Sequence, residues 1–392
     1  MDQTIRLLRP EEIDQLARFK DGIFGHARGF FARRHPDLMA MSPDCSLIME
    51  ENGQIIGHVG AYPMALRVGG DKVAGGVEFT CGGIGGVSTA PAARGRGVMS
   101  RLMKASIERM RERGWYLSVL WGDEQRYMNF GYRTAGLKYQ LRVTRRSLDK
   151  AGITPSKTVE EVDASDGQVL AALGKFYPAI AYGVDRGRHL QKLRKYGVRT
   201  FVGEEGYLVS LKEMAGDLQI TELVSPTGRE AELIYGAMQL ALAQAATVEL
   251  AAVRTAETER LWRVANYWQI YPQGMFRIID WPKLLMVLAP YLESRAAGLP
   301  PFVAVIGCRW EEDVERATVR WDGRKLEVSA GDMAASAGGG ASPAGGQVVA
   351  VDLDNPHLTG LLLGGPLTRE ELPGPFARLL PVPVHIPQLD HV

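Results

Sequence analysis

The sequence contains little cysteine: Cys45, Cys81 and Cys308 among 392 residues. These cysteines are odd in number and far apart, and no Cys-x-x-Cys pair or histidine pair at metal-ligand spacing accompanies them. The pattern excludes a disulfide framework and argues against a zinc site. We therefore expect no bound metal, and a hydrophobic content of 46% supports ordinary packed cores.

An excess of charge of either sign is also missing. The 46 Lys and Arg residues balance 45 Asp and Glu residues, for a net charge of +1. This balance indicates neither a nucleic-acid-binding surface nor an acidic tail. The N-terminus lacks a basic-then-apolar signal, and no apolar run is long enough to cross a bilayer. We expect a cytoplasmic protein that binds neither nucleic acid nor membrane.

The segment 86–99, GVSTAPAARGRGVM, carries most of the functional information. A β-rich stretch leads into a turn rich in glycine and arginine, and the helix that follows has little acidic charge in its first turn. This arrangement offers backbone N–H groups and the positive end of a helix dipole to an anion. No Lys-Ser/Thr follows the glycines, which excludes a Walker loop. The run 82–86, GGIGG, lies inside an apparent strand, so it does not fit a dinucleotide fingerprint.

The turn contains the pattern Arg94-x-x-Gly97-x-Met99. It resembles the pyrophosphate-binding motif Gln/Arg-x-x-Gly-x-Gly/Ala of the GNAT (Gcn5-related) N-acetyltransferases, with Met99 in place of the final small residue. The resemblance implies acetyl-CoA as co-substrate. It implies that strand backbone at Val87 and Thr89 bonds the pantetheine arm and that the pyrophosphate is surrounded by Arg94, Gly95, Arg96, Gly97, Val98 and Met99.

A second segment supports the same family. Thirty residues after Gly97, Tyr127, Gly131 and Tyr132 match the Tyr-x-x-x-Gly-Phe/Tyr pattern that GNAT enzymes often carry. The resemblance implies that Tyr127 lies near the acetyl-CoA sulfur and protonates the departing thiolate. A free phenol has a pKa of about 10, so it stays protonated at neutral pH and can donate.

The pattern around these motifs agrees with an α/β fold. Alternating or continuous apolar stretches predict strands at 4–9, 46–49, 54–59 and 115–120. Apolar residues recur at helical spacing from 98 to 110. This order matches the GNAT core through about residue 145.

The chain is too long for one such domain, so two or three are expected. Residues 151–290 show a second β-β-α-β order, with strands predicted at 207–211, 218–223 and 248–253 and a helix at 230–245. Residues 291–392 contain predicted strands at 302–308, 317–321, 325–328 and 348–353 and a Gly/Ala/Ser-rich loop at 329–347.

This layout resembles the Eis-like (enhanced intracellular survival) acetyltransferases. The resemblance implies a mixed α/β chain with a GNAT domain at 1–150, a degenerate GNAT-like domain at 151–290 and a sterol-carrier-protein-like domain at 291–392. It also implies a homo-oligomer, with a hexamer as the expected form. The segment 273–280, QGMFRIID, and a proline-rich tail contribute to this resemblance.

The implied reaction is direct transfer of an acetyl group to an amine, which must be neutral to attack, so a base is needed. In Eis-like enzymes the C-terminal carboxylate has this role, which here falls on Val392. Other candidate bases are Glu78, Asp123, Glu124, His26 and His58. Candidate acceptors are a small polyamine or aminoglycoside-like molecule and a peptidyl amine. A non-catalytic acyl-CoA sensor and a lipid-binding scaffold are the alternative functions.

Overall fold

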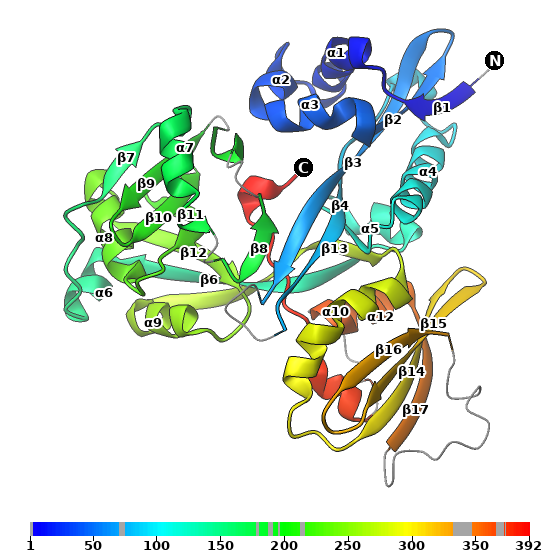
Figure 1. Ribbon diagram of the computed structural model, residues 1–392. Helices are drawn as coiled ribbons and strands as arrows, with labels where there is room; N and C mark the ends of the chain where they lie inside the picture. The colour runs from blue at the N-terminus through cyan, green and yellow to red at the C-terminus, as the bar shows by residue number, and fades with distance from the viewer. Residues whose placement is uncertain are drawn as a thin grey trace.

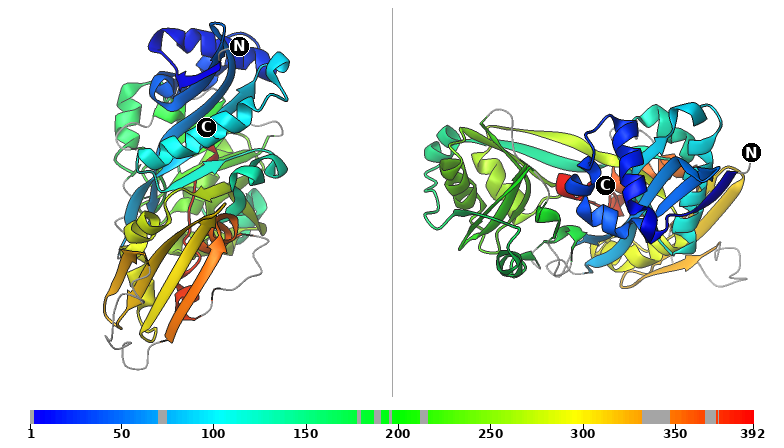
Figure 2. Two further views of the ribbon diagram at one scale, coloured as in Figure 1. Left: turned by 90° about the vertical axis from the view of Figure 1, so that its right-hand side faces the viewer. Right: turned by 90° about the horizontal axis from the view of Figure 1, so that it is seen from above.

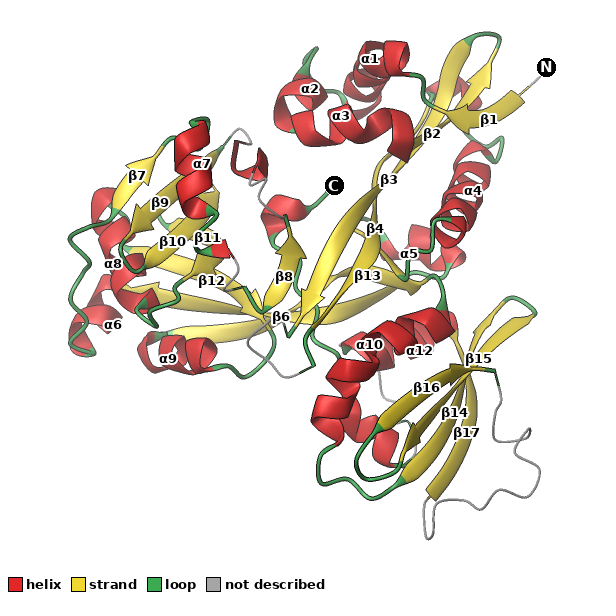
Figure 3. Cartoon of the chain, in the orientation of Figure 1, coloured by secondary structure: helices red, strands yellow, loops and turns green. Residues whose placement is uncertain are grey.

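The structure is a computed structural model that describes residues 3–69, 75–177, 180–186, 191–194, 197–211, 216–331, 347–365, 372 and 374–392. Most of the loop predicted at 329–347 lies outside these residues. The chain combines helices with two β-sheets (Figures 1 and 3), which confirms the expected mixed α/β class.

Its strands are β1 (Gln3–Leu7), β2 (Ser46–Glu51), β3 (Gln54–Val68), β4 (Val77–Thr89), β5 (Leu117–Leu120), β6 (Arg133–Thr144), β7 (Glu160–Val162), β8 (Tyr182–Asp185), β9 (Val198–Gly203), β10 (Gly206–Leu211), β11 (Leu218–Val224), β12 (Ala245–Ala251), β13 (Tyr267–Ile278), β14 (Phe302–Trp310), β15 (Asp313–Trp321), β16 (Leu326–Ala330) and β17 (Gln347–Asp354). Its α-helices are α1 (Ile13–Phe24), α2 (Phe30–Arg34), α3 (Pro36–Cys45), α4 (Val98–Glu112), α5 (Glu124–Tyr127), α6 (Arg145–Lys150), α7 (Gly167–Leu173), α8 (Glu230–Leu240), α9 (Ala256–Val264), α10 (Trp281–Ala296) and α12 (Asn355–Leu363).

One sheet joins the first two thirds of the chain. Among the described residues it has the order β1-β2-β3-β4-β5-β13-β6-β12-β11-β10-β9-β7, and β8 pairs with β3. Strand β13 comes from far along the sequence, yet it lies antiparallel to both β5 and β6. The first unit is therefore interleaved with the second, and the sheet continues without a break past residue 150.

The second unit repeats the strand–helix–strand arrangement of the first. Strands β11 and β12 are parallel and are connected by α8, whose buried side packs into an apolar cluster with both strands. Helix α8 is shorter than the predicted 230–245. Leu242 adopts a left-handed φ of 56°, and the N–H of Ala243 donates to the carbonyl of Met238, which ends the helix and lets β12 begin at Ala245.

The last part of the chain forms a separate four-stranded sheet, in the order β16-β15-β14-β17. Helices α10 and α12 pack on it, and the indole N–H of Trp281 donates to the carbonyl of Ile306 at 2.8 Å. Figure 2 shows this sheet at one end of the molecule and α1–α3 at the other. Its apolar cluster is continuous with residues of β3, β4 and β5, so the third region is fixed to the first.

Candidate active site

Strands β4 and β5 are parallel but pair over only a short stretch of residues. The paired residues of β4 are Cys81, Gly82 and Gly83, opposite Leu117, Ser118 and Val119. Beyond Gly83, β4 continues to Thr89 while β5 ends at Leu120. The edge of β4 from residue 84 to residue 89, which includes Val87 and Thr89, is therefore not paired with β5. An unpaired strand edge offers backbone donors and acceptors to an extended ligand.

The turn after β4 opens directly into α4. Gly95 and Gly97 have φ of 75° and 73°, and Gly97 is the N-cap of the helix. No side chain of the described residues caps α4, its first turn contains no acidic residue, and a methyl group placed on either glycine would meet no described atom within 4 Å. The turn thus combines uncapped helical N–H groups with open space at both glycines, a combination that suits phosphate binding at a helix N-terminus.

The side chains of this turn differ in their surroundings. Arg94 is exposed, whereas Arg96 forms an ion pair and a 3.1 Å hydrogen bond with Glu51 at the end of β2. Val98 is buried and Met99 is half-buried, and both pack with the apolar cluster under α4. The thioether of Met99 is therefore part of that packing, although small residues are usual at this position of the motif.

Tyr127 ends the short helix α5, which begins at its N-cap Asp123. The Tyr127 ring packs against Gly122, where a methyl group would come within 2.9 Å of it. Burial raises the pKa of the Tyr127 phenol above its ordinary value, so the hydroxyl is protonated at neutral pH. The described residues supply no hydrogen-bond partner for this hydroxyl. Within the described part of the chain, the phenol is thus a proton donor without an acceptor.

Val392 lies against the glycine run of β4. A methyl group on Gly83 would come within 2.6 Å of a Val392 methyl carbon, and one on Gly85 would come within 2.6 Å of the Val392 carboxyl carbon. Residues two apart in a strand share a face. The two glycines therefore leave room on one face of β4 for Val392, whose side chain also packs beside Tyr62.

The tail that carries Val392 is held by the second unit. The fully buried carboxylate of Asp390 accepts a 3.0 Å hydrogen bond from Nε of Arg186 and forms an ion pair with Lys192 at 3.2 Å. Arg186 also pairs with Glu222 of β11 at 2.5 Å. Leu389 packs in the apolar cluster around α7. Figure 1 shows the end of the chain beside β3 and β8.

Trp121 connects the tail with the end of β5. Its ring stacks on His391 with centroids 3.7 Å apart, and its N–H donates to the carbonyl of Gln273 at 2.9 Å. The amide of Gln273 in turn donates to the carbonyl of Ile386 at 2.5 Å. The tail therefore binds β13 as well as the second unit. The sequence did not predict these contacts, because the residues that make them are scattered from residue 121 to residue 391.

Comparison with known proteins agrees with this architecture. The family model of the acetyltransferase (GNAT) domain matches residues 4–135. The structure of a GCN5-related N-acetyltransferase from Kribbella flavida is similar to this chain with a TM-score of 0.68 and 18% identity, over 99% of this chain and 100% of that one. The structure of Eis1 from Mycobacterium abscessus is similar with a TM-score of 0.60 and 15% identity, over 93% of this chain and 90% of that one.

Residues 4–135 form a GNAT acetyltransferase domain, and the chain as a whole has an Eis-like fold. A GCN5-related N-acetyltransferase from Anabaena variabilis is also similar, with a TM-score of 0.65 and 17% identity, over 93% of this chain and 90% of that one. Comparison with curated protein sequences gave no significant match. At such identities the structural likeness concerns the fold, and the GNAT assignment rests on residues 4–135.

In this GNAT domain the other candidate bases have structural surroundings. The fully buried ring of His58 bonds the carbonyl of Gly86 at 2.8 Å, and burial lowers the pKa of His58 to about 3. Asp123 accepts from the N–H of Gln125, and Glu124 accepts from the N–H of Thr134 at 3.2 Å. Both carboxylates thus stabilise the segment around Tyr127.

The two remaining candidates lie apart from the glycine turn. Glu78 is at the start of β4, 3.8 Å from Arg67, and burial raises the pKa of its carboxyl. His26 stacks on Phe30 with centroids 4.0 Å apart. In the described part of the chain, no three His, Cys, Asp or Glu residues form a group that could hold a metal ion. Its described helices also lack the length and apolar character needed to cross a membrane.

Proposed function

We propose that this GNAT acyltransferase transfers an acetyl group from acetyl-CoA directly to an amine. The observation that carries the proposal is the parting of β4 and β5 beside an uncapped helix N-terminus, with a carboxylate on the face of β4 at Gly85. The first two features suit a pantetheine arm and a pyrophosphate. The third supplies a base for the amine.

The pantetheine arm is proposed to bond the free edge of β4 at Val87 and Thr89. The pyrophosphate is proposed to bind the turn formed by Arg94, Gly95, Arg96, Gly97, Val98 and Met99. Backbone N–H groups are the main donors in this proposal, because Arg96 is engaged with Glu51. Arg94 remains exposed and can add a charge-assisted contact.

In the proposed step the amine nitrogen attacks the thioester carbonyl carbon, forming the C–N bond as the C–S bond breaks. The Val392 carboxylate takes the proton that the amine loses. Tyr127 gives its phenolic proton to the departing sulfur, so the products are the amide and CoA. Exchange with water restores both groups. The raised pKa of Tyr127 supports its role as the acid.

The acceptor is proposed to be a small polyamine or aminoglycoside-like molecule rather than a peptide. Both carboxylate oxygens of Asp37, near the N-terminus of α3, are buried without a hydrogen-bond partner among the described residues. The Asp37 charge acts on the hydroxyl of Tyr62, and Tyr62 packs with Val392. A buried, unpaired carboxylate in this position favours an acceptor with a second ammonium group.

We also propose that the chain self-associates, in keeping with the hexamer expected from the resemblance. Strand β13 exposes a row of large apolar side chains, at Tyr267, Trp268, Ile270 and Tyr271, each at least 40% exposed. Apolar patches of this kind mark protein contacts. Light scattering of the wild type and of Trp268→Glu tests the idea, and an equal mass for both would argue against this surface.

The division into a GNAT domain (1–150), a GNAT-like domain (151–290) and a sterol-carrier-protein-like domain (291–392) is likewise a proposal. The repeated strand–helix–strand order of the second unit and the separate four-stranded sheet of the third region support it.

Calorimetric titration of acetyl-CoA, followed by CoA release in the presence of spermidine and of a lysine peptide, tests the proposed function. One acetyl-CoA bound per chain and faster release with spermidine are expected. Binding without release for any amine would favour an acyl-CoA sensor. Absence of binding would overturn the proposed cofactor site.

A further inference from the structure

A cavity of about 730 Å³ lies in the second unit, beside the C-terminal tail. It is bounded by β8, by the carboxyl ends of β11 and β12, by the N-terminus of α9 and by tail residues His385 and Pro387. Its volume is that of a small-molecule site. No residue proposed for the acetyl-transfer reaction lines it.

The cavity has the same place in its unit as the proposed acyl-CoA site has in the first unit. Strands β11 and β12 are parallel and pair only over 218–220 and 246–248. Beyond Ile220 and Val248 the strands continue without pairing to each other, as β4 and β5 do. Helix α8 follows β11 as α4 follows β4. The fold therefore provides a second pair of parallel strands that separate beyond a short paired region.

The N-termini of the helices beside β11 and β12 disfavour a bound anion, in contrast to the N-terminus of α4. Helix α4 begins without acidic residues, whereas α8 carries Glu230 and Glu232 in its first turn and α9 carries Glu257 and Glu259. Glutamates at these positions repel phosphate and occupy the favourable end of the dipole themselves. A CoA-like polyphosphate is thus disfavoured here.

The inner wall presents hydrogen-bond acceptors. Glu249, at the end of β12, is 3% exposed; its Oε1 pairs with Lys138 at 3.0 Å, but its Oε2 has no hydrogen-bond partner among the described residues. The Nδ1 of His385 lies 3.3 Å from Oε1 of Gln273, which can only accept. Nδ1 must therefore carry the proton of the neutral ring, and Nε2 is left as an acceptor. Burial lowers the pKa of His385 to about 3, so the ring is neutral at physiological pH.

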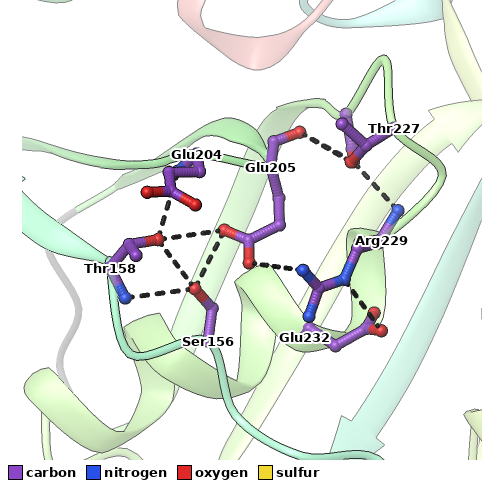
Figure 4. Close-up of polar contacts among 8 residues, drawn as sticks. Ser156, Thr158, Glu204, Glu205, Thr227, Arg229 and Glu232 are labelled. Atoms are coloured by element: carbon purple, nitrogen blue, oxygen red, sulfur yellow. Dashed lines mark hydrogen bonds and ion pairs between the residues drawn. The ribbon is translucent and has the colours of Figure 1, made fainter.

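The rim of the cavity is built in advance of any ligand. The hydroxyls of Ser225 and Thr227 donate to the backbone carbonyl of Glu205 at 3.0 and 3.2 Å. The Glu205 carboxylate accepts from Ser156 at 2.9 Å and pairs with Arg229 at 3.2 Å (Figure 4). These contacts hold the β11–α8 loop in place, and a pre-organised loop reduces the entropy lost on binding.

We propose that this cavity binds a small organic cation bearing an amine or ammonium group. The nitrogen would donate to the free oxygen of Glu249 and to Nε2 of His385. The carbon skeleton would pack on Tyr182, Leu223 and Leu250, which line the cavity. The proposal concerns the second unit alone and does not depend on acetyl transfer in the first.

Spermidine is the probe, with affinity measured by calorimetry and location by amide hydrogen exchange on the full chain. We expect slower exchange in 222–230 and 249–258, and a Kd for these segments about tenfold higher in Glu249→Gln, as removal of a charge-assisted hydrogen bond implies. Ala256→Trp, an exposed change at the mouth of the cavity, avoids disturbing the core and is expected to abolish the protection.

Glu259→Gln is the matched control. Glu259 lies on α9, as Ala256 does, but it pairs with Arg254 and does not line the cavity. It is expected to leave the affinity unchanged. Protection from amide exchange that is confined to Val392 and α4 would overturn the proposal. An equal spermidine affinity in the wild type, Glu249→Gln and Ala256→Trp would overturn it too. Absence of any spermidine binding would overturn it as well.

Discussion

The strand pairs β4–β5 and β11–β12 have the same connectivity but bear different chemical groups. In each pair, two parallel strands separate after a short paired region. In the first pair a glycine turn with open space around it leads into α4, whose N-terminus has no side-chain cap and no acidic residue. In the second pair α8 begins with glutamates, and Glu230 is held by Arg260 at 2.5 to 2.9 Å. The comparison teaches that the topology creates a gap between strands, while a few residues in the first helical turn decide which ligand charge the gap accepts.

The largest expected effect comes from filling the first gap. Gly97→Trp should reduce acetyl-CoA binding below detection, because an indole would occupy the open space before α4. Gly114→Trp is the matched control: Gly114 also has a left-handed φ, 68°, and open surroundings, but it follows the other end of α4. Calorimetry of both variants measures the effect. Equal affinities for Gly97→Trp and Gly114→Trp would remove the turn from the cofactor site.

The second-largest effect is expected from removing the hydroxyl of Tyr127, the proposed general acid. Tyr127→Phe should lower kcat by about 10² to 10³ with little change in acetyl-CoA affinity, since proton donation to the thiolate is lost and packing is kept. Tyr116→Phe, on a half-buried tyrosine of the same domain, serves as the control. Steady-state rates of CoA release report the difference. Wild-type turnover in Tyr127→Phe would exclude the phenol from the mechanism.

A smaller effect is expected from breaking the contacts by which the second unit holds the C-terminal tail. Asp390→Ala leaves Arg186 and Lys192 without a carboxylate that they share, and loss of one partner of a buried pair costs about 3–5 kcal/mol. Thermal unfolding should show a lower Tm. At temperatures where the variant is folded, kcat should also fall, because the tail that positions Val392 has lost its anchor. Full activity in a folded variant would be evidence against Val392 as the base.

The smallest effect is expected at Arg96, in the glycine turn before α4. Arg96→Ala should weaken acetyl-CoA binding only a few-fold, because the Arg96 guanidinium is already engaged with Glu51. The difference should shrink as salt is added, since exposed charges are screened. Titrations at two ionic strengths would show this. A loss as large as that of Gly97→Trp would mean that the guanidinium, and not the backbone, binds the phosphates.

Much of the fold was readable in the sequence. The strands expected at 46–49 and 54–59 are β2 and β3, and the helix expected from Val98 is α4. The 273–280 segment was noticed but its place was not, because β13 pairs with β5 and β6 across more than a hundred residues. Local periodicity contains no information about such a pairing. The predicted helix end at 245 was wrong because the left-handed Leu242 stops α8 earlier.

The site was only partly readable. The roles expected for Tyr127, Val392 and the turn from Arg94 to Met99 remain predictions, although the structure gives each a suitable environment. The glycines of 82–86 were recognised in the sequence only as an unsuitable dinucleotide motif. Their use lies in packing: Gly82 makes room for Met110 and Trp115, and Gly83 and Gly85 make room for Val392.

The sequence by itself determined the local elements, the glycine turn before α4 and the family of the first domain, because capping, periodicity and turn chemistry act between near neighbours in the chain. The tertiary structure alone decided what surrounds Val392, which carboxylates are paired and where the second cavity lies. Those features depend on contacts between residues hundreds of positions apart, such as Arg186 with Asp390, and burial in the folded state is what gives such contacts their strength.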